Sequence, residues 1–111
     1  MRWILLALGL LALPSLAQTP PPPASQVEKQ DAFRLGVQLY ALGRYEAALE
    51  LFERALKEKP QDPDVLYWLA RAQLKVGLLN PALENAKGLV ARNPRYIGGY
   101  MVLSEAYVAL F

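Results

Sequence analysis

A 34-residue repeat is the feature that most limits what this sequence can fold into. Pro60 lies 34 residues before Pro94, and the same shift relates Gly43 to Gly77. It also aligns Ala48 with Ala82, Leu35 with Leu69 and Leu103, and Gly36 with Ala70 and Ser104. A period of this length, with small residues at fixed offsets, predicts an array of helical hairpins.

Each period contains the hydrophobic spacing of two helices. Apolar residues recur at helical spacing from Ala32 to Leu42, and Gly43 then offers a backbone that tolerates positive φ. A second apolar stripe begins at Tyr45, has a charged opposite face, and ends before Pro60. The pattern predicts helices at 28–42, 45–59, 63–76, 81–92 and 96–110.

Two of the predicted helix starts carry a capping signal. Asp62 precedes Pro63, and Asn80 precedes Pro81. A short polar side chain accepts hydrogen bonds from the first free N–H groups of a helix, and proline is tolerated in the first turn. We therefore expect Asp62 and Asn80 to cap the helices that follow them.

The repeated residues resemble the tetratricopeptide repeat, a helical hairpin marked by leucine, small, aromatic, alanine and proline positions. The matching residues are Ala32, Leu35, Gly36, Leu39, Ala48, Phe52 and Pro60, then Leu66, Leu69, Ala70, Gln73, Ala82, Ala86 and Pro94, then Tyr100, Leu103, Ser104 and Tyr107. Gln73 and Ala86 depart from the pattern. The resemblance implies an all-α fold in which antiparallel hairpins stack as a short right-handed α-solenoid. It would hold about two and a half repeats, at about 29–62, 63–96 and 97–111.

The N-terminal segment has the pattern of a secretory signal. Arg2 precedes the apolar run Trp3–Leu13, and Ser15 and Ala17 are small residues placed as before a cleavage site. The run is shorter than the ~20 residues that span a bilayer core. We expect a signal peptide at 1–17 that is cleaved after Ala17, with an uncleaved anchor or a buried helix as alternatives. The protein would then be exported to the periplasm or cell envelope, or secreted.

A proline-rich segment separates this signal from the repeats. Residues 18–27 include four consecutive prolines, which favour an extended polyproline II conformation. We interpret this segment as a spacer or tail, with a ligand for a proline-binding module as the alternative. The tetratricopeptide domain would span 28–111. Many Leu, Ala, Pro and Arg residues also favour a bacterial source.

The composition argues against catalysis and against nucleic-acid binding. The chain has a net charge of +2, no cysteine and no histidine. A nearly balanced charge gives no electrostatic reason to bind nucleic acid, and the commonest general base and metal ligand is missing. Asp62 and Asp64 are close in sequence, but both lie at a helix start, where carboxylates favour the helix dipole. We expect no enzymatic activity, no metal and no cofactor.

The resemblance implies a concave groove, lined by the first helix of each repeat, that binds a protein or peptide partner. Arg71 and Lys75 lie four residues apart on one helix face and could hold a carboxylate. The candidate groove residues are Phe33, Val37, Tyr40, Tyr67, Arg71, Leu74, Lys75 and Met101. Alternatively, Phe33 and Tyr67 pack against a neighbouring repeat and Arg71 is only solvated. Val37 and Arg71 stand where relatives that clamp a C-terminal carboxylate need Asn or Lys, so we do not expect that clamp.

The last predicted helix has no polar capping segment after it. The resemblance implies that a terminal repeat needs such a cap, because its apolar face is otherwise uncovered. The candidate association face is Leu103, Tyr107, Leu110 and Phe111. Three interpretations remain open: a fragment of a longer array, docking of a partner, or formation of a homo-oligomer. The alternative function is accordingly a self-associating or membrane-tethered spacer, with no stable membrane span once the signal is cleaved.

Overall fold

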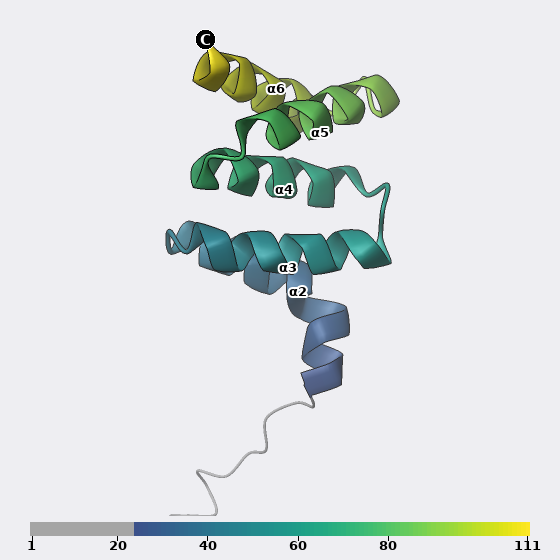
Figure 1. Cartoon of the computed structure of the whole chain (residues 1–111). Coiled ribbons are helices and arrows are strands. Elements are labelled where there is room, and N and C mark those ends of the chain that lie inside the picture. Colours follow the sequence, from purple (N-terminus) through teal and green to yellow (C-terminus); the bar gives the residue numbers. More distant parts are fainter. Residues whose placement is uncertain (1–23) are drawn as a thin grey trace, which may run out of the picture.

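The computed structural model describes residues 24–111, with side chains from Ala32 onward, and this range consists of helices and irregular segments, without strands. The helices are α2 (Ala24–Ala41), α3 (Tyr45–Glu58), α4 (Pro63–Val76), α5 (Leu79–Arg92) and α6 (Ile97–Leu110) (Figure 1). The expected signal peptide at 1–17 and residues 18–23 of the expected linker lie outside the described residues. Among α2–α6, no helix has the length and apolar character needed to cross a membrane.

Two turns of the same design close the hairpins. Gly43 and Gly77 have φ angles of +80° and +90°, the left-handed region that glycine adopts without strain. After them, the Arg44 N–H donates to the Leu39 carbonyl at 2.9 Å, and the Leu78 N–H donates to the Gln73 carbonyl at 2.8 Å. Each bond spans five residues, as in a Schellman motif, and satisfies a carbonyl at the helix end. The turn predicted at Gly43 is confirmed.

The helices form two layers. Consecutive helices pack against each other from α2 to α6, and α4 also contacts both α2 and α6. No contact joins α3 to α5 within the described range. We call α2, α4 and α6 the inner layer, and α3 and α5 the outer layer. Helices of the same layer contact each other only in the inner layer, and the helices stack one above another in Figure 1. The expected fold class, a short helical solenoid, is confirmed.

Small residues allow the two helices of the first hairpin to approach closely. A Cβ atom added to Gly36 on α2 would lie 2.6 Å from Phe52 Cε1 on α3. The Phe52 side chain is fully buried, between the Phe33 ring at 6.0 Å and the Trp68 ring at 6.2 Å. The close approach expected at Gly36 is confirmed. At the equivalent place in the second hairpin, Ala70 is fully buried.

The second hairpin compensates for its two departures from the repeat pattern. Gln73 Oε1 on α4 accepts a hydrogen bond from Asn85 Nδ2 on α5 at 2.8 Å, so this position joins the helices through polar groups. Ala86 is fully buried where the first hairpin has Phe52, and it packs with Leu89. A smaller side chain and a side-chain hydrogen bond therefore replace part of the aromatic core.

Two predicted helix starts are wrong. α2 begins at Ala24 instead of residue 28, because no residue between the last proline and Gly36 prevents helical hydrogen bonding, so 24–27 are helical. α5 begins at Leu79, and its N-cap is Leu78, which makes no side-chain capping bond. Asn80 therefore lies inside the helix and does not cap it. Pro81 is tolerated in the first turn, where N–H groups have no intrahelical acceptor.

Candidate functional site

Five aromatic rings form a continuous row. Its three central rings lie on α2 and α4, and its two ends lie at the start of α3 and just before α6. It runs through Tyr96, Tyr67, Trp68, Tyr40 and Tyr45, with centroid separations of 6.1, 5.6, 5.3 and 5.0 Å in that order. The planes of neighbouring rings are inclined by 66° to 80°, the edge-to-face geometry that aromatic pairs favour. We call these five residues the aromatic row.

The guanidinium of Arg71 lies over the middle of the row. Its Cζ atom is 5.1 Å from the Tyr40 centroid, 5.3 Å from that of Trp68 and 5.5 Å from that of Tyr67. Each such contact contributes about 0.5–2 kcal/mol, depending on desolvation. No carboxylate of the described residues forms an ion pair with Arg71. The positive charge is thus held in place by ring faces and forms no ion pair with a carboxylate in the part of the chain that the structure describes.

Two polar atoms at this point are buried and have no hydrogen-bond partner among the described residues. They are Tyr40 Oη and Arg71 Nε. Burial raises the pKa of Tyr40 above its usual value; the Arg71 charge opposes this rise, and the negative charge of Glu105 on α6 adds to it. An unpaired buried donor typically costs about 1–3 kcal/mol.

Lys75 extends the cationic surface by one helical turn. It is exposed on α4, four residues after Arg71, and its Nζ atom lies 5.6 Å from the centroid of Tyr45. Residues at this spacing share one helix face and differ by about 6 Å along the axis. Arg71 and Lys75 therefore form two neighbouring cations, each placed over aromatic rings.

At the other end of the row, the first residues of α4 contact those before α6. The Tyr96 hydroxyl donates to Asp64 Oδ1 at 2.7 Å. Burial, followed by this hydrogen bond and the Asp64 charge, raises the pKa of Tyr96. Gly98 leaves room for the rings, because a Cβ there would lie 2.6 Å from Tyr96 Cε2 and 2.9 Å from Tyr67 Cδ1. The contact between the Tyr67 and Tyr96 rings, together with the Tyr96–Asp64 hydrogen bond, thus joins α4 to the residue that precedes α6.

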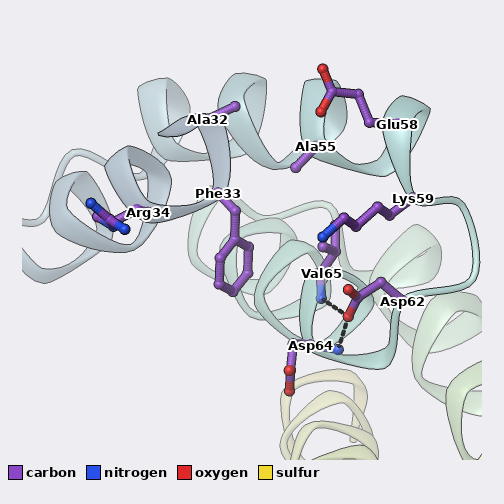
Figure 2. Close-up of a pocket in the computed structure, with 9 residues that line it drawn as sticks. All are labelled: Ala32, Phe33, Arg34, Ala55, Glu58, Lys59, Asp62, Asp64 and Val65. Atoms are coloured by element: carbon purple, nitrogen blue, oxygen red, sulfur yellow. Dashed lines mark hydrogen bonds between the residues drawn. The ribbon is translucent and has the colours of Figure 1, made fainter. Parts of the chain in front are cut away.

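The two carboxylates at the start of α4 border a cavity of about 310 Å³ between α2, α3 and α4. Figure 2 shows the Phe33 ring and the Lys59 side chain pointing into this space, while Glu58 points away. Asp62 Oδ1 accepts from the Asp64 N–H at 2.9 Å and the Val65 N–H at 3.4 Å, so the predicted N-cap is confirmed. Because Asp64 accepts from Tyr96, both carboxylates have structural partners and do not form an acid–base pair.

The candidate groove residues differ in how far they reach the surface. Phe33, Val37 and Leu74 are half-buried and pack on the hydrophobic core. Met101 on α6 is 51% exposed. Tyr40, Tyr67, Arg71 and Lys75 come together at the row. The apolar strip is thus narrower than the sequence pattern indicates, and its centre is aromatic and cationic.

The candidate association residues on α6 divide into two pairs. Leu103 and Leu110 are half-buried, and Leu103 packs against the core beside Val102. Tyr107 and Phe111 are 41% and 98% exposed, and their rings stack with centroids 6.3 Å apart. The outward part of this face is therefore aromatic.

Sequence reasoning missed three members of the row. Trp68 aligns with a polar residue of the first repeat, so the 34-residue shift gave it no role. Its position three residues before Arg71 was the available signal, since such pairs lie on one helix face. Tyr45 and Tyr96 escaped because the groove was sought only on the first helix of each repeat, whereas they lie at the start of α3 and just before α6.

Comparisons with known proteins agree with this architecture. The tetratricopeptide-repeat family profile matches residues 39–95, about half of the chain. The TPR repeat-containing protein YpiA of Bacillus subtilis (strain 168) is 34% identical over 76 residues, which are 68% of this chain and 18% of YpiA. The crystal structure of TTC0263, a thermophilic TPR protein of Thermus thermophilus, matches with 81% identity and a TM-score of 0.72. The match covers 73% of this chain and 42% of TTC0263.

This chain thus spans less than half the length of either relative. The tetratricopeptide fold generally mediates protein–protein interactions, and proteins that have it are generally non-enzymatic scaffolds. The repeat period, the hairpin turns, the layered packing and the matched profile lead to one conclusion: the chain belongs to the tetratricopeptide-repeat family.

Proposed function

We propose that the inner layer binds a protein partner and that the aromatic row, with Arg71 and Lys75, is the centre of the binding surface. One observation carries the proposal: the Arg71 guanidinium lies over three rings and forms no ion pair with a described carboxylate. A guanidinium held by ring faces loses little rotamer freedom on binding. Aromatic and arginine side chains also dominate binding hot spots.

Affinity capture with matched variants tests this surface. Arg71→Ala removes the caged charge, whereas Lys57→Ala removes an exposed charge on the outer layer. We expect partners identified by mass spectrometry to be lost with Arg71→Ala and kept with Lys57→Ala, while circular dichroism shows unchanged helicity in both. If the Arg71→Ala chain retains the same partners, the inner layer is not the binding surface.

The proposed scaffold acts outside the cytoplasm, as the signal pattern at 1–17 supports. Residues 1–23 fused to an alkaline phosphatase reporter should give activity, because that enzyme needs an oxidising compartment for its disulfides. Mass spectrometry of the processed chain should show an N-terminus at Gln18. An inactive fusion together with an unprocessed chain would contradict export.

A self-associating spacer remains the second candidate, favoured by the composition of α6. Glu105 is the single charged residue of this helix, while Tyr107 and Val108 are exposed. Size-exclusion chromatography with light scattering decides between the candidates. A monomer over the concentration range that supports partner capture excludes the spacer, and a dimer broken by Tyr107→Ser would favour it.

A further inference from the structure

We propose that two copies of this chain form a dimer in which their α6 helices pack antiparallel about a two-fold axis at Ser104. α6 lies at one end of the stack and contacts α4 and α5 (Figure 1). The inference does not depend on partner binding by the aromatic row. It rests on the second candidate, self-association, and names the interface that self-association uses.

The exposed face of α6 is a single apolar stripe. Six of the eight large hydrophobic side chains that are exposed in the described range lie on this helix or directly after it. We call these six residues the α6 stripe: Ile97, Tyr100, Met101, Tyr107, Val108 and Phe111. With 3.6 residues per turn, all six lie within about 120° around the helix axis. Since the opposite side is buried at Val102 and Ala106, α6 is apolar on both sides, a pattern typical of a helix covered on both sides.

The α6 stripe is symmetric about Ser104. This exposed residue lies at the middle of the stripe, both along the helix and around it. The residues three and four positions away on either side are large and apolar, and so are the two that lie seven positions away. An isologous interface requires such a patch, complementary to itself. Two antiparallel copies pair Ile97 with Phe111, Tyr100 with Val108, and Met101 with Tyr107.

A small residue stands where the two helices cross. Ser104 aligns with Gly36, which lets α2 and α3 approach closely, and with the fully buried Ala70 of the second hairpin. The stripe on either side of Ser104 repeats at intervals of three and four residues, the spacing of a seam between two paired helices. The exposed face of α6 therefore has the pattern of a helix-packing surface.

The area of the stripe is large enough for a stable contact. Phe111, Tyr100 and Tyr107 are 98%, 46% and 41% exposed. Because an aromatic side chain covers about 150–250 Å², these three rings alone expose about 300–450 Å² per copy. With the three aliphatic side chains added, the stripe exceeds the few hundred Å² usual for an apolar patch on a monomer. It is of the order of the ~800 Å² that each partner buries in a standard interface.

Polar residues at the other end of the stack argue against a head-to-tail arrangement. α4 packs on the first hairpin through Trp68 and Ala72, whose equivalents one repeat earlier are Arg34 and Gln38. Both equivalents are exposed on α2. Stacking α2 of one copy on α6 of another would bury a guanidinium and an amide against apolar side chains, which is costly. The antiparallel pair buries no charge, because Glu105 lies about 100° around the helix from Ser104.

Single-cysteine cross-linking of the full-length chain tests the two-fold axis. The chain has no cysteine, so Ser104→Cys introduces a unique thiol, which the axis places opposite its copy. A disulfide requires Cα atoms within about 7 Å. We expect Ser104→Cys to oxidise to a covalent dimer and Ala109→Cys, which is exposed outside the stripe, to stay monomeric. A mixture of Ile97→Cys and Phe111→Cys should form the mixed dimer, because antiparallel pairing places these two residues opposite each other.

Sedimentation equilibrium measures the dimer without a cross-link. Val108 is 76% exposed, so Val108→Lys leaves the single copy intact but places a cation in the apolar interface. We expect this change to raise the dissociation constant of the dimer at least about tenfold. Lys57→Ala, on the outer layer, should leave the constant unchanged.

Three results overturn the proposal. The first is a chain that sediments as a monomer, and the second is oxidation of Ala109→Cys as fast as Ser104→Cys. The third is cross-linking of Ile97→Cys to itself, which indicates parallel helices. Protection of the Ser104→Cys thiol by another protein in a cell extract, while the purified chain stays monomeric, also rejects a second copy as the occupant. A monomeric chain whose Arg71→Ala variant loses its captured partners would reject the dimer and leave the proposed function of the aromatic row standing.

Discussion

Replacing Gly36 with alanine tests the close helix crossing on which the first hairpin depends. The added Cβ would lie 2.6 Å from Phe52 Cε1, 2.9 Å from Cδ1 and 3.1 Å from Cζ. The first two distances are shorter than real Cβ contacts allow. The ring cannot move aside freely, because Phe52 is fully buried between Phe33 and Trp68. Either the ring or the α2 backbone must therefore shift.

The expected loss of stability is the difference between two effects. Overpacking of a core by one methyl group costs about 1–3 kcal/mol. Alanine is more favourable than glycine inside a helix by about 1 kcal/mol. Since the obstacle is a buried ring, we take the upper part of the first range and expect a net loss of about 1–2 kcal/mol. At about 5 °C per kcal/mol for a domain of this size, the melting temperature should fall by about 5–10 °C.

Gly88→Ala is the matched control for this change. Gly88 is also helical, on α5, but its added Cβ would meet only Arg92 Nη1, at 4.0 Å. Alanine there should raise the free energy of unfolding by up to about 1 kcal/mol, through helix propensity alone. Urea denaturation followed by circular dichroism measures both variants. If Gly36→Ala stabilises the chain as Gly88→Ala does, the close crossing is refuted.

Three further changes test individual contacts by urea denaturation. Asp62→Ala should lower the free energy of unfolding by about 1 kcal/mol through loss of the N-cap, while Asn80→Ala, which removes no cap, should change it by less than about 0.5 kcal/mol; equal effects would contradict the assigned caps. Asn85→Ala leaves Gln73 without its partner and should cost about 1 kcal/mol; an unchanged midpoint would show that the bond contributes nothing. Because the pKa of Tyr40 is raised in the folded state, Tyr40 contributes to the free energy of unfolding at low pH. This contribution is lost as pH rises past the usual pKa of about 10. Stability should therefore fall above that pH, and less steeply in Tyr40→Phe; identical pH profiles would contradict this.

Most of the fold could be predicted from the sequence because its main determinants are local. The φ angle required at Gly43 and the capping carboxylate of Asp62 act within one turn of the chain, and the 34-residue shift then repeats the hairpin. The errors arose where the local sequence was compatible with more than one helix start. At Asn80, the pattern of a polar residue before proline suggested a cap, but the Schellman turn at Gly77 returns the backbone to helix earlier.

The candidate site was harder to predict because it depends on tertiary contacts. Arg71 and Lys75 were identified from their spacing on one helix, which is a local property. Their aromatic environment was not, because Tyr40, Trp68 and Tyr45 come from three different helices. Burial of Tyr40 Oη and Arg71 Nε arises only when α2 packs against α4. A pattern within one helix cannot reveal an unpaired atom between two helices.

Emission from Trp68 tests the central claim, that the aromatic row is the binding surface. The chain has two tryptophans, so Trp3→Phe leaves Trp68 as the single reporter, in contact with the rings of Tyr40 and Tyr67. We predict a saturable change in its emission as a partner identified by affinity capture is added, and no change when the chain also carries Arg71→Ala. Binding of that partner with constant Trp68 emission would place it elsewhere on the chain and contradict the account.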